Sequence, residues 1–162
     1  MKGLFSFLTQ KILFQVEKEE LAKLLRFESS TLPAGEETSL MEYGSRMKPG
    51  QRDMYYLNAP SRQLAESSPY FEALKKKDVE ILFCYESYDE LVLMQLQEFD
   101  KKKLTSVEKE MRLDSGATGD AAEGESNESL ELVDWLQAQL RPKVSKVKIT
   151  KRLESHPCVI TV

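Results

Sequence analysis

Two short apolar runs with a helix-starting signal between them constrain the fold of this chain more than any other feature. The runs are "MYYL" at 54–57 and "VEILFCYE" at 79–86. Between them, Ser68-Pro69 places a capping residue before a proline at the first position of an expected helix. Strands that are apolar on both faces belong to sheets that helices cover on both sides.

The elements that follow continue the same alternation. A second helix is expected over residues 87–99, and the run "KLTSVEK" at 103–109 predicts a third strand. The order strand, helix, strand, helix, strand with short joins is typical of a parallel sheet with right-handed crossovers. The sequence therefore predicts an α/β fold built on a small parallel βαβαβ unit.

Two more helices are expected ahead of this unit. Residues 17–28 gather their apolar side chains toward one side, which predicts a helix. Ser39 and Glu42 have the spacing of a capping box, in which each residue bonds a backbone amide of the other. A short helix should therefore begin near Leu40 and end before Pro49.

The composition changes at Asp114. Residues 114–128 hold five acids, three glycines and no bases, and alanine is their only apolar residue. Such a segment cannot bury enough apolar surface to order itself, so a flexible acidic linker and a domain boundary are expected here. Beyond it, a helix at 130–140, an alternating strand at 144–153 and an apolar strand from Cys158 predict an incomplete α+β piece over 129–162.

Three carboxylates, Glu86, Asp89 and Glu90, stand where the second strand meets the second helix. Ser87 and Glu90 have capping-box spacing, and negative charge is favourable in the first turn of a helix. A pair of carboxylates such as Glu86 and Asp89 also suits general acid/base catalysis. Helix capping is the preferred interpretation because it explains the same residues without a substrate, and a hydrolase remains the alternative.

The second helix carries more apolar residues than one buried face needs. Four of them recur at helical spacing: Val92, Leu93, Leu96 and Phe99. Leu91 and Met94 widen this apolar surface. Either the helix lies between the sheet and another layer, or Leu91 and Met94 are partly exposed and accept apolar partners. Together with Trp135 of the later helix, they are the candidate residues of a client or partner surface.

Several kinds of site find no support in the sequence. The net charge of −4 gives no reason to expect nucleic acid as a partner. The seven glycines match no phosphate-binding loop. His156 and Cys158 offer two possible metal ligands, whereas a structural zinc site needs about four. No catalytic residue, cofactor site or metal site is therefore expected in this chain.

Cysteine usage and the apolar segments bear on the compartment. Cys84 and Cys158 both lie in strand-like apolar runs, where each is expected as a buried, reduced thiol of an intracellular protein. No apolar stretch approaches the roughly 20 residues that a membrane-spanning helix needs. The first sixteen residues lack the arginines of a transit peptide and a cleavage site, so no targeting segment is expected there.

Long strings of this sequence resemble the family of ninety-kilodalton heat-shock chaperones. They include "LAKLLRFESSTLP", "TSLMEYGSRMKPGQRDMYYLNAP", "SSPYFEALKKKDVEILFCYESYDEL", "QEFDKKKLTSVEKE" and "VSKVKITKRLESHPCVITV", in the order of the family. The resemblance runs from about Glu17 to Val162, and residues 1–16 do not look like the family. "CYESYDEL" and "QEFDKKKL" are most similar to its mitochondrial branch, so the resemblance implies a location in the mitochondrial matrix.

The resemblance implies a domain organisation and a function. Residues 17–113 are similar to the end of the middle domain with its small α/β subdomain, and 129–162 to the start of the C-terminal dimerisation domain, truncated before its dimer helices. Whole members are homodimeric, stress-responsive chaperones that bind and hydrolyse ATP with Mg²⁺ to fold unfolded or partly folded clients. The segments matching their nucleotide domain and ATP-sensing arginine are not in this sequence, so this chain is expected to bind clients without catalysis and not to dimerise well.

An adaptor is the alternative function. In that case the chain is self-contained and binds one folded partner through the helix that carries Leu91 and Met94. A chaperone segment should bind many non-native proteins weakly, whereas an adaptor should show one saturable partner.

Overall fold

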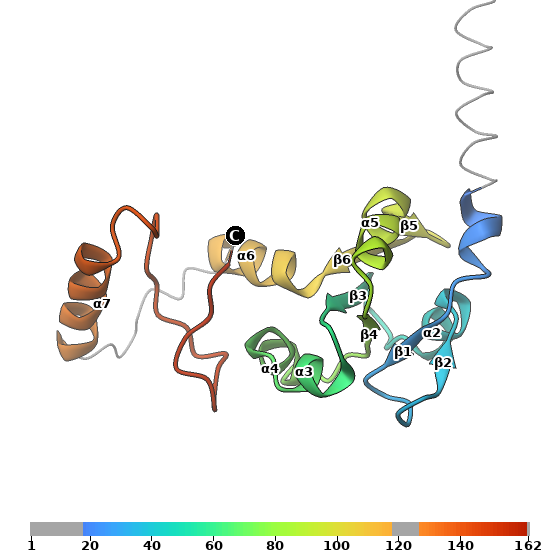
Figure 1. Cartoon of the computed structure of the whole chain (residues 1–162), viewed down its shortest axis with the longest axis horizontal. Helices are drawn as coiled ribbons and strands as arrows, with labels where there is room; N and C mark the ends of the chain where they lie inside the picture. The colour runs from blue at the N-terminus through green and yellow to red at the C-terminus, as the bar shows by residue number, and fades with distance from the viewer. Residues whose placement is uncertain (1–17, 118–126, 162) are drawn as a thin grey trace, which may run out of the picture.

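The computed structural model describes residues 18–117 and 127–161, and Figure 1 shows their arrangement. In this part of the chain six strands form one sheet in the order β2-β1-β4-β3-β6-β5. The strands are β1 (Phe27–Ser29), β2 (Glu37–Thr38), β3 (Asp53–Asn58), β4 (Ile81–Cys84), β5 (Glu98–Phe99) and β6 (Lys102–Ser106). The helices are α2 (Leu40–Arg46), α3 (Arg62–Glu66), α4 (Pro69–Lys75), α5 (Ser87–Leu96), α6 (Val107–Ala117) and α7 (Asn127–Gln139).

The centre of the sheet is parallel. Strand β3 pairs in parallel with β4 on one side and with β6 on the other. Helices α3 and α4 join β3 to β4, and α5 with the short strand β5 joins β4 to β6. Strands β1, β2 and β5 are added in antiparallel pairings. The expected mixed α/β class is confirmed, and the sheet is larger and more mixed than a three-stranded parallel unit.

Two local expectations ahead of β3 have different outcomes. Helix α2 begins at Leu40 behind the expected capping box, in which Ser39 N donates to Glu42 at 2.8 Å and Glu42 N donates to Ser39 Oγ at 3.2 Å. The expected helix over 17–28 is wrong in its second half, because Phe27 begins strand β1. Helical structure covers 18–22, and Phe27, which pairs with Thr38 of β2, is buried in the core.

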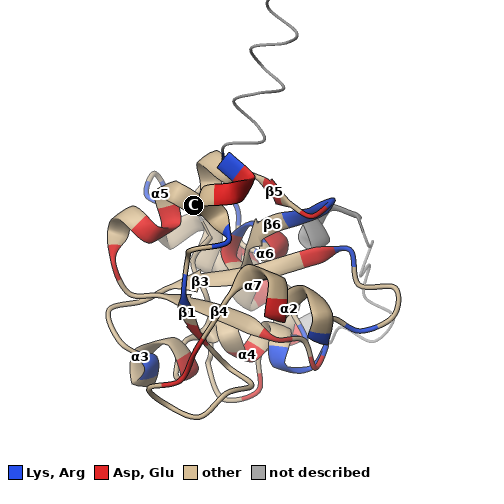
Figure 2. Cartoon of the chain, turned by 90° about the vertical axis from the view of Figure 1, so that its right-hand side faces the viewer, with Lys and Arg blue, Asp and Glu red and all other residues tan. Residues whose placement is uncertain are grey.

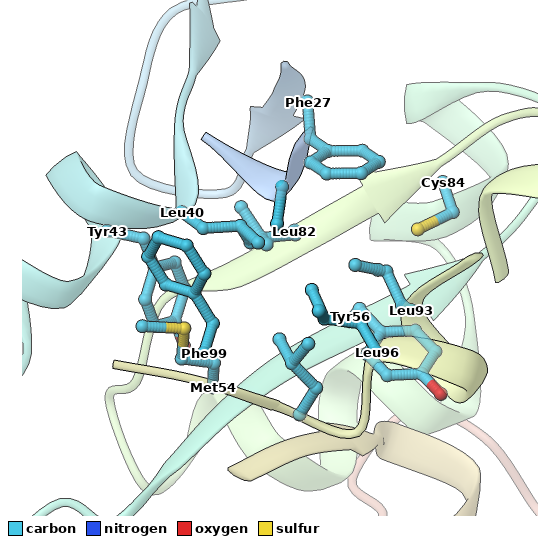
Figure 3. Close-up of a cluster of buried hydrophobic side chains, with 12 residues drawn as sticks. Phe27, Leu40, Tyr43, Met54, Tyr56, Leu82, Cys84, Leu93, Leu96 and Phe99 are labelled. Atoms are coloured by element: carbon cyan, nitrogen blue, oxygen red, sulfur yellow. The ribbon is translucent and has the colours of Figure 1, made fainter. Parts of the chain in front are cut away.

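Alternation along β3 divides the core into two layers. Successive side chains of a strand point to opposite faces of its sheet. Met54 and Tyr56 therefore face α2 and α5, in the cluster that Figure 3 shows, while Tyr55 and Leu57 face α3, α4 and α6. Cys84 belongs to the first layer and is buried as expected. Both faces of the central strands are covered, which explains their nearly continuous apolar sequence.

The expected linker lies mostly outside the described residues. Helix α6 continues to Ala117, so the boundary expected at Asp114 falls inside a helix. Helix α7 begins at Asn127, and its span agrees with the helix expected at 130–140. Residues 118–126, the middle of the expected linker, are not among the described residues.

The strands expected after α7 are not formed in the described residues up to 161. Residues 144–153 alternate in the sequence, but none of them is in a strand, and neither are residues 158–161. A strand needs a neighbour that supplies backbone partners, and no described strand lies alongside this segment. Cys158 is consequently exposed, which corrects the expectation of a buried thiol.

Candidate binding surface

The carboxylates at the start of α5 hold the helix and the neighbouring loop. Asp89 accepts from the backbone amide of Glu86 at 3.3 Å, so Glu86 is the capping position. The expected pairing of Ser87 with Glu90 is wrong by one residue, because Ser87 already lies in the helix. Glu90 instead accepts from Asn58 Nδ2 at 2.8 Å, which ties α5 to the end of β3.

One side of α5 is buried in the core. Leu93 and Leu96 are buried in the layer that contains Tyr56 and Cys84 (Figure 3). Burial, with the nearby carboxylates of Asp89 and Glu90, raises the pKa of the Cys84 thiol far above its usual range, so it stays protonated and unreactive.

Phe99 was expected on the same helical face but lies in β5. The reason is Gln97, whose φ of 62° ends the helix and turns the chain back toward the sheet. Leu104 N then donates to Gln97 O at 2.8 Å. Phe99 reaches the core from the strand instead, in the same buried layer as Leu96.

The other side of α5 exposes large apolar side chains. Leu91 is 60% exposed and Met94 is 55% exposed, and Tyr88 and Val92 are also exposed. Residues three and four apart are neighbours on a helix, so Tyr88, Leu91 and Val92 adjoin and Met94 extends the set by one turn. We call these four residues the α5 surface. Val92 was expected in the buried stripe, and Tyr88 was not among the candidate residues.

Acidic residues stand at one end of the α5 surface. Glu86, Asp89 and Glu90 lie in or next to the first turn of α5, where Figure 2 shows red ribbon on this helix. The apolar part continues toward the C-terminal end of α5, where Lys18 approaches Gln95 O at 3.5 Å. The surface can therefore bury apolar groups, and its acidic end favours neighbouring cations.

Trp135 does not belong to this surface. It lies on α7, where it is 58% exposed together with Leu130 and Leu132. Figure 1 shows α7 at one end of the long axis of the described chain, with α6 between it and α5. Of the three candidate residues, the structure brings only Leu91 and Met94 together.

A polar cluster on α4 was not expected from the sequence. Glu72 of α4 contacts Ser155 and His156, which follow it by more than 80 residues. No local sequence pattern connects such distant positions. The sequence showed only that α4 and the C-terminal segment each contain polar residues, without indicating that they meet. The same contact occupies His156, which was considered above as a metal ligand.

The described residues offer neither a metal-binding cluster nor a membrane-spanning helix. Residues 18–117 and 127–161 contain no group of three or more His, Cys, Asp or Glu side chains arranged to hold a metal ion. Within the same ranges, every helix is too short or too polar to cross a lipid bilayer.

Comparison with known proteins identifies the family. Residues 13–162 match the family described as Hsp90 protein. The chain belongs to the Hsp90 family, which confirms the resemblance carried by its sequence strings. The match begins at Leu13, a little before the expected start of the resemblance at Glu17.

Individual relatives agree with this assignment. The chain is 52% identical over 157 residues to "Heat shock protein 75 kDa, mitochondrial" of Bos taurus and 53% identical over 152 residues to the protein of that name in Rattus norvegicus. It is 39% identical over 146 residues to "Chaperone protein HtpG" of Desulfitobacterium hafniense. The alignments cover 91%, 90% and 88% of this chain but only 22%, 22% and 24% of these relatives. The chain thus spans less than a quarter of their length.

Proposed function

We propose that this chain is the connector segment of an Hsp90-family chaperone and that it binds non-native client proteins through the α5 surface. The observation that carries the proposal is the exposure of Leu91 and Met94 on a helix whose other side is fixed in the core. Contiguous exposed apolar groups mark sites of protein association, and methionine adapts to partners of different shape. Unfolded segments offer apolar side chains of many shapes, which suits such a surface.

The position of the chain within the family supports the connector role. We assign residues 17–113 to the end of the middle domain, 114–128 to the variable acidic segment, and 129–162 to the start of the C-terminal domain. ATP with Mg²⁺ and the dimer contacts would both involve segments of the whole protein that this sequence does not match. The two mammalian relatives carry "mitochondrial" in their names, which supports a mitochondrial location.

An aggregation assay tests client binding directly. A chemically unfolded model protein is diluted into buffer with the parent chain, and light scattering follows its aggregation. The double variant Leu91→Ser/Met94→Ser should lose most of the suppression seen with the parent, because it removes the apolar contact area. Leu64 of α3, 54% exposed, provides the matched control. Leu64→Ser removes a comparable exposed group outside the α5 surface and should suppress aggregation like the parent.

The results separate a chaperone segment from an adaptor. Suppression should extend to several unrelated clients and should weaken with both α5 substitutions. Equal suppression by the parent and the double variant would reject the α5 surface. Failure with every unfolded client, together with saturable binding of one folded protein, would favour the adaptor. Calorimetric titration with Mg-ATP should give no heat of binding, and a micromolar site would refute the assignment of the nucleotide site to another segment.

A further inference from the structure

The C-terminal segment makes a series of polar contacts with α4 and the residue that follows it. Residues 151–160 lie against this helix, and we call them the strap. Lys76 Nζ donates to Lys151 O at 3.0 Å and pairs with Glu154 at 3.1 Å. The hydroxyl of Tyr70 donates to Ile160 O at the other end of the strap. Between these contacts lies Glu72.

One carboxylate gathers most of the contacts. Glu72 accepts from the backbone amide of Glu154, from Ser155 N at 2.5 Å and from Ser155 Oγ at 3.0 Å, and it also contacts His156 Nδ1. Hydrogen bonds to an ionised acceptor are about twice as strong as neutral ones. The side chain of Glu72 is 13% exposed, so the strap covers much of it.

Apolar burial contributes little to holding the strap. Leu153 and Val159 are half-buried, no side chain between residues 144 and 161 is fully buried, and Cys158 and Ile160 are exposed. The ion pair of Lys76 with Glu154 is exposed, and pairs of that kind stabilise little. Since apolar burial is normally the largest favourable contribution to packing, the docked position depends on the hydrogen bonds to Glu72.

We propose that Glu72 is the latch of a detachable strap: its carboxylate holds residues 151–160 on α4, and its removal frees the C-terminal segment from the α/β unit. The charged groups around the latch include Lys76 just after the same helix and Glu154 and His156 of the strap. Glu108 and Arg112 of α6 act on the neighbouring Tyr70. Helix α7 is bonded to the residues just before the strap, because Gln137 Nε2 donates to Ser145 O at 3.0 Å and Val147 N donates to Gln137 Oε1 at 2.6 Å. Opening the latch therefore releases α7 together with the strap. The proposal does not depend on whether the α5 surface binds clients.

The different exposure of the two cysteines allows docking of the strap to be measured in the full chain. Cys84 is buried and Cys158 is exposed, so a nitroxide reagent labels Cys158 selectively. Cys158 lies between His156 and Ile160, both of which contact α4. In the parent chain the label should broaden the amide resonances of α4. In Glu72→Ala these resonances should recover, while the amides of Glu154 and Ser155 exchange with solvent about tenfold faster, as expected for loss of charge-assisted hydrogen bonds.

Controls separate release of the strap from unfolding of α4. Amides of β3 and β4 should stay slow in Glu72→Ala. Glu98→Gln neutralises an exposed carboxylate on β5 and should leave the broadening unchanged. Ser155→Asp leaves α4 intact but brings a second carboxylate against Glu72, and it should detach the strap, whereas Ser155→Ala removes one contact and should not. Broadening that persists in both Glu72→Ala and Ser155→Asp, or that is absent in the parent, would overturn the proposal.

Discussion

Leu93 and Leu91 lie two positions apart on α5, and substitution by alanine should separate their roles sharply. Leu93 has no exposed surface and lies in the layer between α5 and the sheet, whereas Leu91 is largely exposed. Truncating a fully buried leucine removes its transfer free energy and leaves a cavity, at a cost of about 2–5 kcal/mol. The same change at an exposed position costs about 0.5 kcal/mol or less. Leucine and alanine both favour helices, so helix propensity changes little in either variant.

Urea denaturation followed by circular dichroism measures this difference. Leu93→Ala should lower the free energy of unfolding by about 3 kcal/mol, and Leu91→Ala should leave it almost unchanged. In a unit of about 100 residues, such as the α/β unit over 18–117, each kcal/mol shifts the melting temperature by about 4–8 °C. The two variants should therefore differ by about 10 °C or more. Equal losses in both variants would mean that α5 packs differently against the sheet, and the assignment of its exposed side would fail.

Three further predictions test other parts of the structure. Tyr43→Phe should destabilise the chain by about 1–2 kcal/mol in urea, because the buried hydroxyl donates to Glu80 O at 2.6 Å; an unchanged midpoint would contradict this bond. Lys101→Gly should raise the unfolding free energy by about 0.5–1 kcal/mol, because φ is 60° in the β5–β6 turn; a loss would show that the side chain contributes more than the turn. Acid should open the latch. Hydrogen bonds, chiefly from His156, lower the pKa of Glu72 to about 2, so docking is stabilised above the ordinary value of 4.5 and lost as the pH falls toward 2. Strap amides that stay protected at pH 2 while the core is folded would refute it.

Local signals in the sequence were sufficient where neighbouring residues determine the structure. The Ser39 capping box and the Ser68 cap each depend on groups within three residues, and both are present. The apolar runs of β3 and β4 likewise predicted buried strands, because both faces of a covered sheet must be apolar. These features set the α/β class.

Long-range contacts determined what the sequence did not predict. Phe27 reads as the end of an amphipathic helix, but it pairs with Thr38 of β2 at the start of strand β1. Residues 144–153 alternate like a strand but lie in no sheet. Alternation gives a segment one apolar face, but a strand also needs a neighbouring strand to hydrogen-bond with. The pairing of Glu72 with His156 spans 84 residues, and no periodicity reports such a contact.

Only part of the α5 surface could be predicted from the sequence, because exposure depends on long-range packing. Leu91 and Met94 stood out because the helix had more apolar residues than one buried side accommodates. Their exposure, and the separation of Trp135 on α7, depended on how the helices are placed around the sheet. Helical spacing alone did not assign Val92 to the exposed side of α5, because Val92 lies at the border between the buried side and the exposed side of the helix.

The way α5 is fixed to the sheet has a consequence for the thermodynamics of association. Leu93 and Leu96 hold its inner side, Asp89 fixes its first turn, and Gln97 ends it, so the backbone is already ordered before a partner arrives. The entropic cost of binding then falls on the partner and on a few side chains such as Met94. Binding of unfolded clients should accordingly show a negative heat-capacity change that grows with the apolar area covered, and an unfavourable entropy contributed mainly by the client.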